Sequence, residues 1–107
     1  MKLLPRLEEI LLLAIWKLGD GAYGLAIVDQ VEKDTGISWL TGSIYGALNR
    51  LKKTGRIAAV ETGRSPEKTG RPRIYYRLTS KGMDKLIAMQ KINRLIWLDV
   101  PDLGQGR

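Results

Sequence analysis

The sequence predicts a single, mainly α-helical domain that carries one β-hairpin. Three observations predict this class. Apolar residues recur at helical spacing through the first half of the chain, the period changes from 3.6 to 2 after Gly55, and helical spacing returns after Thr79. With 107 residues and no internal repeat or linker, the chain is expected to form one domain over 1–107. The expected element order is helix, helix, helix, strand, strand, helix.

Two helices are predicted over about 5–18 and 22–33. The first begins with a proline, which suits a first helical turn because its missing N–H would have no partner there. Breaks that contain glycine, at 19–21 and 35–36, end the two helices. Three apolar side chains of the first helix fall outside its main apolar stripe, so that helix is apolar on more than one side: Leu12, Leu13 and Trp16.

A third helix is predicted to follow a short extended link at 37–40. Thr41 is expected to cap it, its hydroxyl accepting a backbone N–H of the first turn. Gly55 ends the helix. The stripe expected to face the core consists of Ile44, Ala47, Leu48 and Leu51. Two helices joined by a short link suggest a helix-turn-helix.

Two strands are predicted over about 56–62 and 73–78. The loop between them, 63–72, is rich in Gly, Pro and charge and is too long for a tight turn. In the second strand, Ile74, Tyr76 and Leu78 are expected to face one way. Thr79 caps a last helix. This order is that of a winged helix-turn-helix, divided into a winged helix over about 5–78 with its wing at 56–78, a C-terminal helix at 79–98 and a tail at 99–107.

The composition excludes several kinds of chemistry. Without Cys the chain has no disulfide, thiolate nucleophile or Cys zinc site, and without His it has no imidazole base or His-bound metal. Carboxylates are not clustered either. We therefore expect no enzyme activity, no cofactor and no metal.

The N-terminal segment, 1–18, superficially resembles a secretory signal. Charged residues and a proline interrupt it, and no small-residue cleavage site follows. Its uninterrupted apolar run, 10–16, is far shorter than the roughly 20 residues needed to span a bilayer. A cytoplasmic protein without a membrane partner is expected.

The excess of positive charge lies in the middle of the chain. The chain has 18 Lys+Arg against 11 Asp+Glu, a net charge of +7. Residues 41–82 carry +8, whereas 1–40 carry −2 and 83–107 carry +1. This distribution points to a polyanionic partner, the alternative being a basic face kept for solubility.

Packing the apolar stripe of the third helix on the core turns an acid-free face outward, which favours contact with the polyanionic DNA. Asn49 can pair with adenine, Arg50 can grip guanine or a phosphate, and Gly46 allows close approach to the groove. In the wing, Arg71 can follow the backbone or enter a narrow minor groove. Alternatively, these are solvated polar residues, Tyr45 seals the core edge and the wing is a solvated loop. The candidate DNA-binding residues are Thr41, Ser43, Tyr45, Gly46, Asn49, Arg50 and Lys53 in the helix, and Arg64, Lys68, Arg71 and Arg73 in the wing.

Three stretches resemble the PadR-type transcriptional regulators: 18–24, 42–51 and above all 70–82, which reads GRPRIYYRLTSKG. The chain is similar to the short subgroup that lacks a separate C-terminal domain. The resemblance implies a dimeric winged-helix repressor that binds a palindromic operator and often responds to small molecules. The chain departs from the family pattern at Gly46, where Pro is usual, and at Lys52 and Lys53, where acidic residues are common.

The last helix is apolar on nearly every side, which a monomer would leave partly exposed. We expect a homodimer in which the first and last helices pack across a two-fold axis. The candidate interface residues are Leu12, Leu13, Trp16, Leu86, Met89, Asn93, Ile96 and Trp97. The alternative is a monomer whose two long helices cover each other. Asn93 could fix the pairing register or simply be solvated.

The expected function is repression by a homodimer that occupies double-stranded DNA at an inverted repeat, with half-site centres about 34–36 Å apart. Trp16, Trp97 and Met89 could line a pocket for a small flat aromatic effector, the alternative being core packing. A winged-helix module that binds a protein instead of DNA is the competing function. Single-stranded nucleic acid is a weaker one, because a stacking platform of interleaved aromatics is missing.

Overall fold

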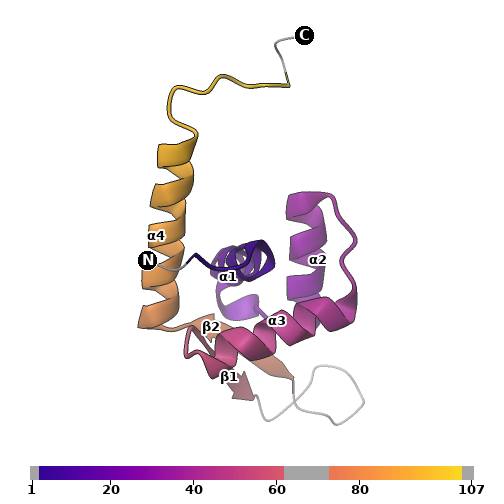
Figure 1. Cartoon of the computed structure of the whole chain (residues 1–107). Coiled ribbons are helices and arrows are strands. Elements are labelled where there is room, and N and C mark those ends of the chain that lie inside the picture. The colour runs from indigo at the N-terminus through magenta and orange to yellow at the C-terminus, as the bar shows by residue number, and fades with distance from the viewer. Residues whose placement is uncertain (1–2, 62–72, 105–107) are drawn as a thin grey trace.

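The elements follow one another in the predicted order, and the chain has the winged helix-turn-helix fold (Figure 1). The computed structural model describes residues 3–61 and 73–104. The elements are α1 (Arg6–Leu18), the 3-10 turn η1 (Gly19–Gly21), α2 (Gly24–Thr35), α3 (Thr41–Lys53), β1 (Ile57–Glu61), β2 (Ile74–Leu78) and α4 (Ser80–Ile96). The predicted strand and helix ends differ from these bounds by one or two residues, apart from 62, which lies outside the described residues.

The core forms around α1, which packs against α2, α3, α4 and β2. Burying one large aliphatic side chain contributes about 1.5–3 kcal/mol, so this shared core is the main force that holds the elements together. Its largest members, which are almost inaccessible to solvent, are Leu11, Leu12, Ile15, Ile27, Val31, Ile44, Leu48, Leu51 and Ile57. The predicted stripe of the third helix is confirmed, since all four of its members are buried.

Thr41 is not the cap of α3, so that prediction is wrong. Leu40 occupies the N-cap position, with no side-chain hydrogen bond there. Its carbonyl oxygen already accepts from the backbone N–H groups of Ser43 and Ile44, at 3.0 and 3.2 Å. Because the first turn closes on Leu40, Thr41 is the first helical residue and its hydroxyl is not in the capping position.

α2 begins two residues later than predicted, because the sheet takes the residues before it. The N–H of Tyr76 donates to the carbonyl oxygen of Ala22 at 2.7 Å, and Tyr23 forms a bridge with Tyr75. These pairings hold Tyr23 in an extended conformation and leave Gly24 to start the helix. A short strand-like segment thus lies beside the hairpin.

The hairpin is antiparallel, with Ile57 opposite Leu78 and Glu61 opposite Ile74. Tyr76 and Leu78 pack against the core, as the alternation predicts. Ile74 does not: it is 45% exposed, opposite Glu61 at the end of the hairpin where the segment 62–72 connects the strands.

The start of α4 is tied to the end of α3. The Thr79 hydroxyl accepts the Gly82 N–H at 3.1 Å, which confirms the predicted cap, and donates to the Gly55 carbonyl oxygen at 2.6 Å. Gly55 has a φ of 75°, a left-handed conformation that glycine adopts without strain. These bonds fix the direction in which α4 leaves the hairpin.

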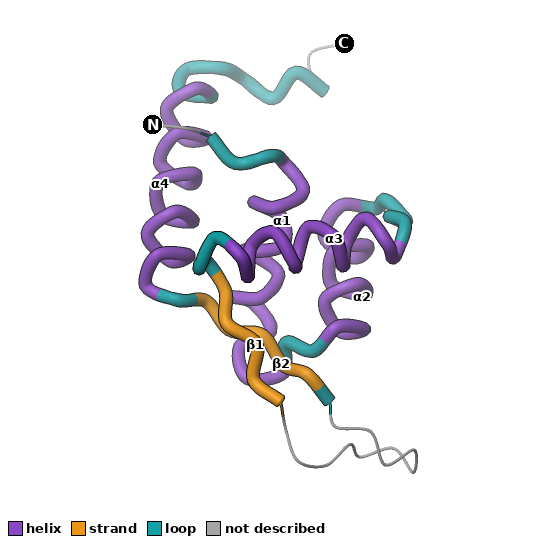
Figure 2. The backbone as a smooth tube through the Cα atoms, turned by 60° about the horizontal axis from the view of Figure 1, so that its bottom comes forward, coloured by secondary structure: helices purple, strands orange, loops and turns teal. Residues whose placement is uncertain are grey.

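α4 runs away from the hairpin, and its C-terminal end projects beyond the other helices (Figures 1 and 2). The molecule is accordingly elongated, with extents of 53 × 31 × 22 Å. Among the described residues, no helix combines the length and apolar character that crossing a membrane would require.

Candidate nucleic-acid interface

α3 lies across the outer surface of the domain with the hairpin beside it, as Figure 2 shows. Its buried stripe faces α1, and the helix contains no acidic residue. The opposite side consists of small or polar side chains, most of them exposed. The predicted residues found on it in exposed positions are Thr41, Ser43, Asn49 and Lys53, with Gly46 half-buried among them. A helix with such a face can enter the major groove of B-form DNA.

Tyr45 leaves this face and packs inward. Its ring is half-buried against the core. A Cβ added to Gly24 would collide with the Tyr45 hydroxyl, so the two elements meet closely at that glycine. This environment agrees with the alternative interpretation of Tyr45, in which its ring seals the edge of the core. Burial, and to a smaller extent the nearby Tyr45, raises the pKa of Tyr76 above its ordinary value of 10.0.

Arg50 is paired with an acid from another helix. Its Nε donates to Oε2 of Glu8 at 3.4 Å, although its side chain remains 58% exposed. Glu8 is only 5% exposed, and among the described residues it is the one buried charged side chain. The sequence contains a signal for the burial of Glu8. Glu8 lies three and four residues before the buried Leu11 and Leu12, so it shares their face of the helix.

At the root of the wing, three side chains stack. The Arg73 guanidinium carbon lies 4.0 Å from the centre of the Tyr23 ring. The rings of Tyr23 and Tyr75 meet edge to face, with their centroids 5.6 Å apart. This arrangement holds a cation where the wing leaves the domain. The other predicted wing residues, Arg64, Lys68 and Arg71, lie outside the described residues.

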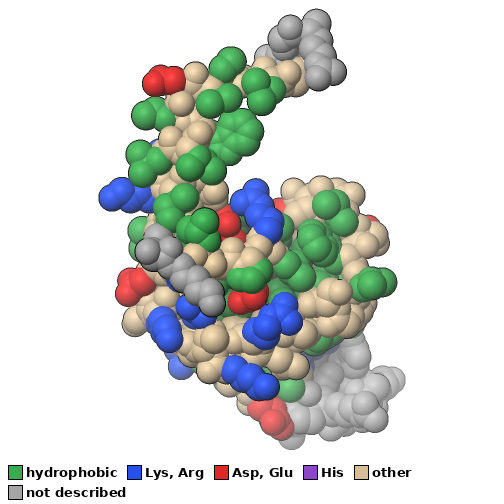
Figure 3. Space-filling view, in the orientation of Figure 1, with side chains coloured by type: hydrophobic (Ala, Val, Ile, Leu, Met, Phe, Trp, Pro, Cys, Tyr) green, Lys and Arg blue, Asp and Glu red, His purple; other side chains and the backbone are tan. Residues whose placement is uncertain are grey.

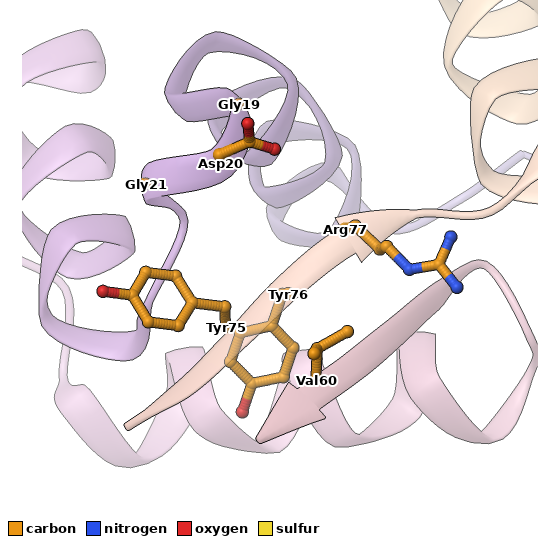
Figure 4. Close-up of a pocket in the computed structure, with 7 residues that line it drawn as sticks. All are labelled: Gly19, Asp20, Gly21, Val60, Tyr75, Tyr76 and Arg77. Atoms are coloured by element: carbon orange, nitrogen blue, oxygen red, sulfur yellow. The ribbon is translucent and has the colours of Figure 1, made fainter. Parts of the chain in front are cut away.

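A cavity of about 450 Å³ lies between η1 and the hairpin (Figure 4). Asp20 lies on its η1 side, while Arg77 and the rings of Tyr75 and Tyr76 come from the hairpin (Figure 4). The described residues contain no group of three His, Cys, Asp or Glu side chains that could hold a metal ion.

A second surface lies between α1 and α4. Leu13 and Trp16, which are 40% and 56% exposed, line a cavity of about 420 Å³ together with Leu86 and Ile87 of α4. Apolar side chains continue along the projecting end of α4, where Figure 3 shows them crowded together. They include Leu95, Ile96, Trp97 and Leu98, all more than half exposed.

Two of the predicted interface residues do not belong to this surface. Leu12 has no exposed area and Met89 only 3%, because both pack inside the domain. They are therefore removed from the candidate interface residues. Met89 is also a candidate for lining an effector pocket, and its burial favours the alternative, core packing. Asn93 is half-buried, and its amide donates to Oε2 of Glu9 at 2.6 Å.

The fold and the exposed, acid-free helix define the class of winged-helix DNA-binding proteins. The family model described as "Transcriptional regulator PadR-like family" matches residues 12–88. The chain belongs to this family, whose members are transcription regulators and not enzymes. It is accordingly a DNA-binding transcription regulator.

Several solved structures are similar to this chain over most of their length. A PadR family regulator from Clostridium difficile is 26% identical, with a TM-score of 0.73 over 86% of this chain and 91% of that one. A PadR-like regulator from Bacillus cereus is 27% identical, with a TM-score of 0.73 over 94% and 93%. H. salinarum RosR, at 21% identity and a TM-score of 0.70 over 92% and 82%, shares the fold. No curated protein matched the sequence.

Proposed function

We propose that the chain is a repressor that binds an inverted-repeat operator in double-stranded DNA as a homodimer. The observation that carries the proposal is the exposed face of α3, which combines small residues with Asn49 and Lys53 and has no acid. An amide can pair with adenine in the major groove, and a lysine can neutralise a phosphate. Repression follows from occupying promoter DNA, and the cytoplasm is the expected location.

Dimerisation is supported by the exposed apolar surface of α1 and α4. Leu13, Trp16 and Ile87 line a groove, and the projecting end of α4 adds further apolar area. Monomeric proteins rarely expose so large an apolar patch. A symmetric pair would bury it twice and double the DNA-contacting surface. The revised candidate residues are Leu13, Trp16, Leu86, Asn93, Ile96 and Trp97.

A small flat aromatic effector is proposed for the groove beside Trp16. The groove of about 420 Å³ is large enough for such a molecule, and Trp97, which is 57% exposed, directly follows the end of α4. Binding there would change the angle between two protomers and release the DNA. An aromatic compound that binds the dimer but leaves its DNA affinity unchanged would contradict this role.

The test is selection of duplexes from a random pool, followed by measurement of the mass of the complex. An enriched inverted repeat with about one helical turn between half-site centres, bound by two protomers, is the expected result. Uniform affinity for every duplex, or one protomer per duplex, would contradict the proposal. The competing protein-interaction function predicts no protected site in footprinting.

A further inference from the structure

The carboxylate of Glu8 lies in a buried position, where a charged group is energetically unfavourable. Glu8 lies in the first turn of α1, yet it is turned inward and its side chain is 7% exposed. Burying a charge requires a partner, since the charge loses its hydration. The partner that the structure provides is Arg50, from the last turn of α3. The pair therefore joins the N-terminal helix to the proposed recognition helix.

The pair engages only part of the guanidinium. Nε of Arg50 points to Glu8, whereas the terminal nitrogen Nη1 lies 3.6 Å from the position where a Cβ of Gly46 would be. Gly46 is one turn earlier on α3, toward the outer face. The guanidinium therefore runs from the buried carboxylate back along the helix, over a residue without a side chain, and the side chain stays 58% exposed.

We propose that Glu8 is a positioning residue that holds Arg50 in the orientation needed to contact DNA. This inference rests on the proposed function. Glu8 engages Nε and thereby fixes the plane of the guanidinium, while the terminal nitrogens remain available to a phosphate or a guanine edge. An arginine without this restraint would lose more side-chain freedom on binding, so its contact would be weaker.

Simple electrostatics gives the opposite expectation, which makes the proposal easy to overturn. Replacing Glu8 by Gln removes a negative charge and raises the net charge of the protein. Because DNA is a polyanion, the added positive charge alone should tighten binding. If Glu8 positions Arg50, the same substitution should weaken binding, since the neutral amide restrains the guanidinium less.

The experiment measures affinity for the duplex most enriched in the selection, using the full chain. Glu8→Gln should weaken binding roughly five- to tenfold, the range expected when a charge-assisted hydrogen bond becomes a neutral one. The matched control is Glu32→Gln, at an exposed position of α2. It removes the same charge, and the variant should bind DNA equally well or more tightly. Equal or tighter binding by Glu8→Gln would overturn the inference.

A double-mutant cycle separates positioning from a general structural role. In an Arg50→Ala background, Glu8→Gln should change the affinity less than about twofold, because no guanidinium is left to orient. A loss that persists in that background would refute positioning of Arg50.

Arg50→Lys provides a second route if Glu8→Gln fails to fold. Its single ammonium cannot engage Glu8 and DNA through separate nitrogens, so weaker binding is expected, and wild-type affinity would overturn the inference. If the wild-type protein enriches no duplex, the proposed function fails instead, which is a different outcome from an unchanged Glu8→Gln.

Discussion

Glu8 and Glu9 are neighbours in the sequence, but the fold gives their carboxylates different partners. Glu8 faces inward and pairs with Arg50 of α3, whereas Glu9 accepts a hydrogen bond from Asn93 of α4 and pairs with Arg6 at 3.3 Å. The sequence suggests that acids near a helix start interact favourably with the helix dipole, and the spacing puts Glu8 on the face of Leu11 and Leu12, but neither signal names a partner. Partners 42 and 84 residues away depend on how the helices pack, which local patterns do not contain.

At the same scale, Asn49 is the residue expected to read a base. It is exposed on the outer face of α3, so Asn49→Ala should leave the fold intact. It should cost about 1–3 kcal/mol at one base pair of each half-site and relax the preference there. Repeating the duplex selection with the variant checks this. Lys53→Ala is the comparison, because loss of a phosphate contact should weaken all sequences alike and lower the salt slope by about one. An equal loss on all sequences for Asn49→Ala would contradict base recognition.

Tyr76 makes the free energy of unfolding depend on pH in the alkaline range. Burial raises its pKa above the ordinary value of 10.0, so the folded state holds the phenol proton more tightly than the unfolded chain does. Its contribution is complete below pH 10 and is lost as the pH rises through the folded pKa. Urea unfolding at pH 7 and pH 10.5 should show a larger loss for the wild type than for Tyr76→Phe. Equal losses in the two proteins would assign the alkaline instability to other groups.

At the scale of elements, periodicity predicted the order and the approximate ends because each helix and strand buries one continuous face. The stripe of α3 shows this well, since all four of its members are buried. The errors arise where tertiary pairing competes with local preference. The sheet keeps Ala22 and Tyr23 out of α2, and Leu40 replaces Thr41 as the N-cap. The tip of the wing, 62–72, lies outside the described residues.

At Gly82, α4 packs closely on the backbone of Arg56, which lies between α3 and β1. A Cβ there would collide with the carbonyl oxygen of Arg56, which is backbone and cannot move aside. Gly82→Ala should therefore destabilise the fold by about 1–3 kcal/mol, despite the better helix propensity of alanine. Denaturant unfolding measures the effect. Gly42→Ala is the matched control: its Cβ would meet open space, so a small stabilisation is expected. A stability unchanged by Gly82→Ala would show that α4 shifts freely on the hairpin.

At the scale of the whole molecule, the pattern of the sequence indicated excess apolar surface on the first and last helices but could not assign it residue by residue. Helical spacing says which residues share a face. It does not say which face packs inside the domain, because that depends on the tertiary arrangement. The elements α2, α3, α4 and β2 cover α1, whereas α4 is covered only along part of its length. For this reason Leu12 and Met89 are buried inside the domain, whereas Trp16 and Trp97 are exposed.

The remaining exposed surface leads to a prediction about assembly. Ile87 is 56% exposed and lines the groove between α1 and α4, so a charge there should not disturb the protomer. In a dimer it would place unpaired carboxylates in an apolar interface, and Ile87→Glu should therefore yield monomers, as light scattering would measure. Affinity for the full inverted repeat should fall at least about 100-fold, because the two half-sites no longer act together, while affinity for one half-site changes little. Leu25→Glu, on α2 and away from the groove, is the control that should remain dimeric. If Ile87→Glu stays dimeric with full operator affinity, the two-fold axis passes through another surface, and the two recognition helices must be spaced differently on the DNA.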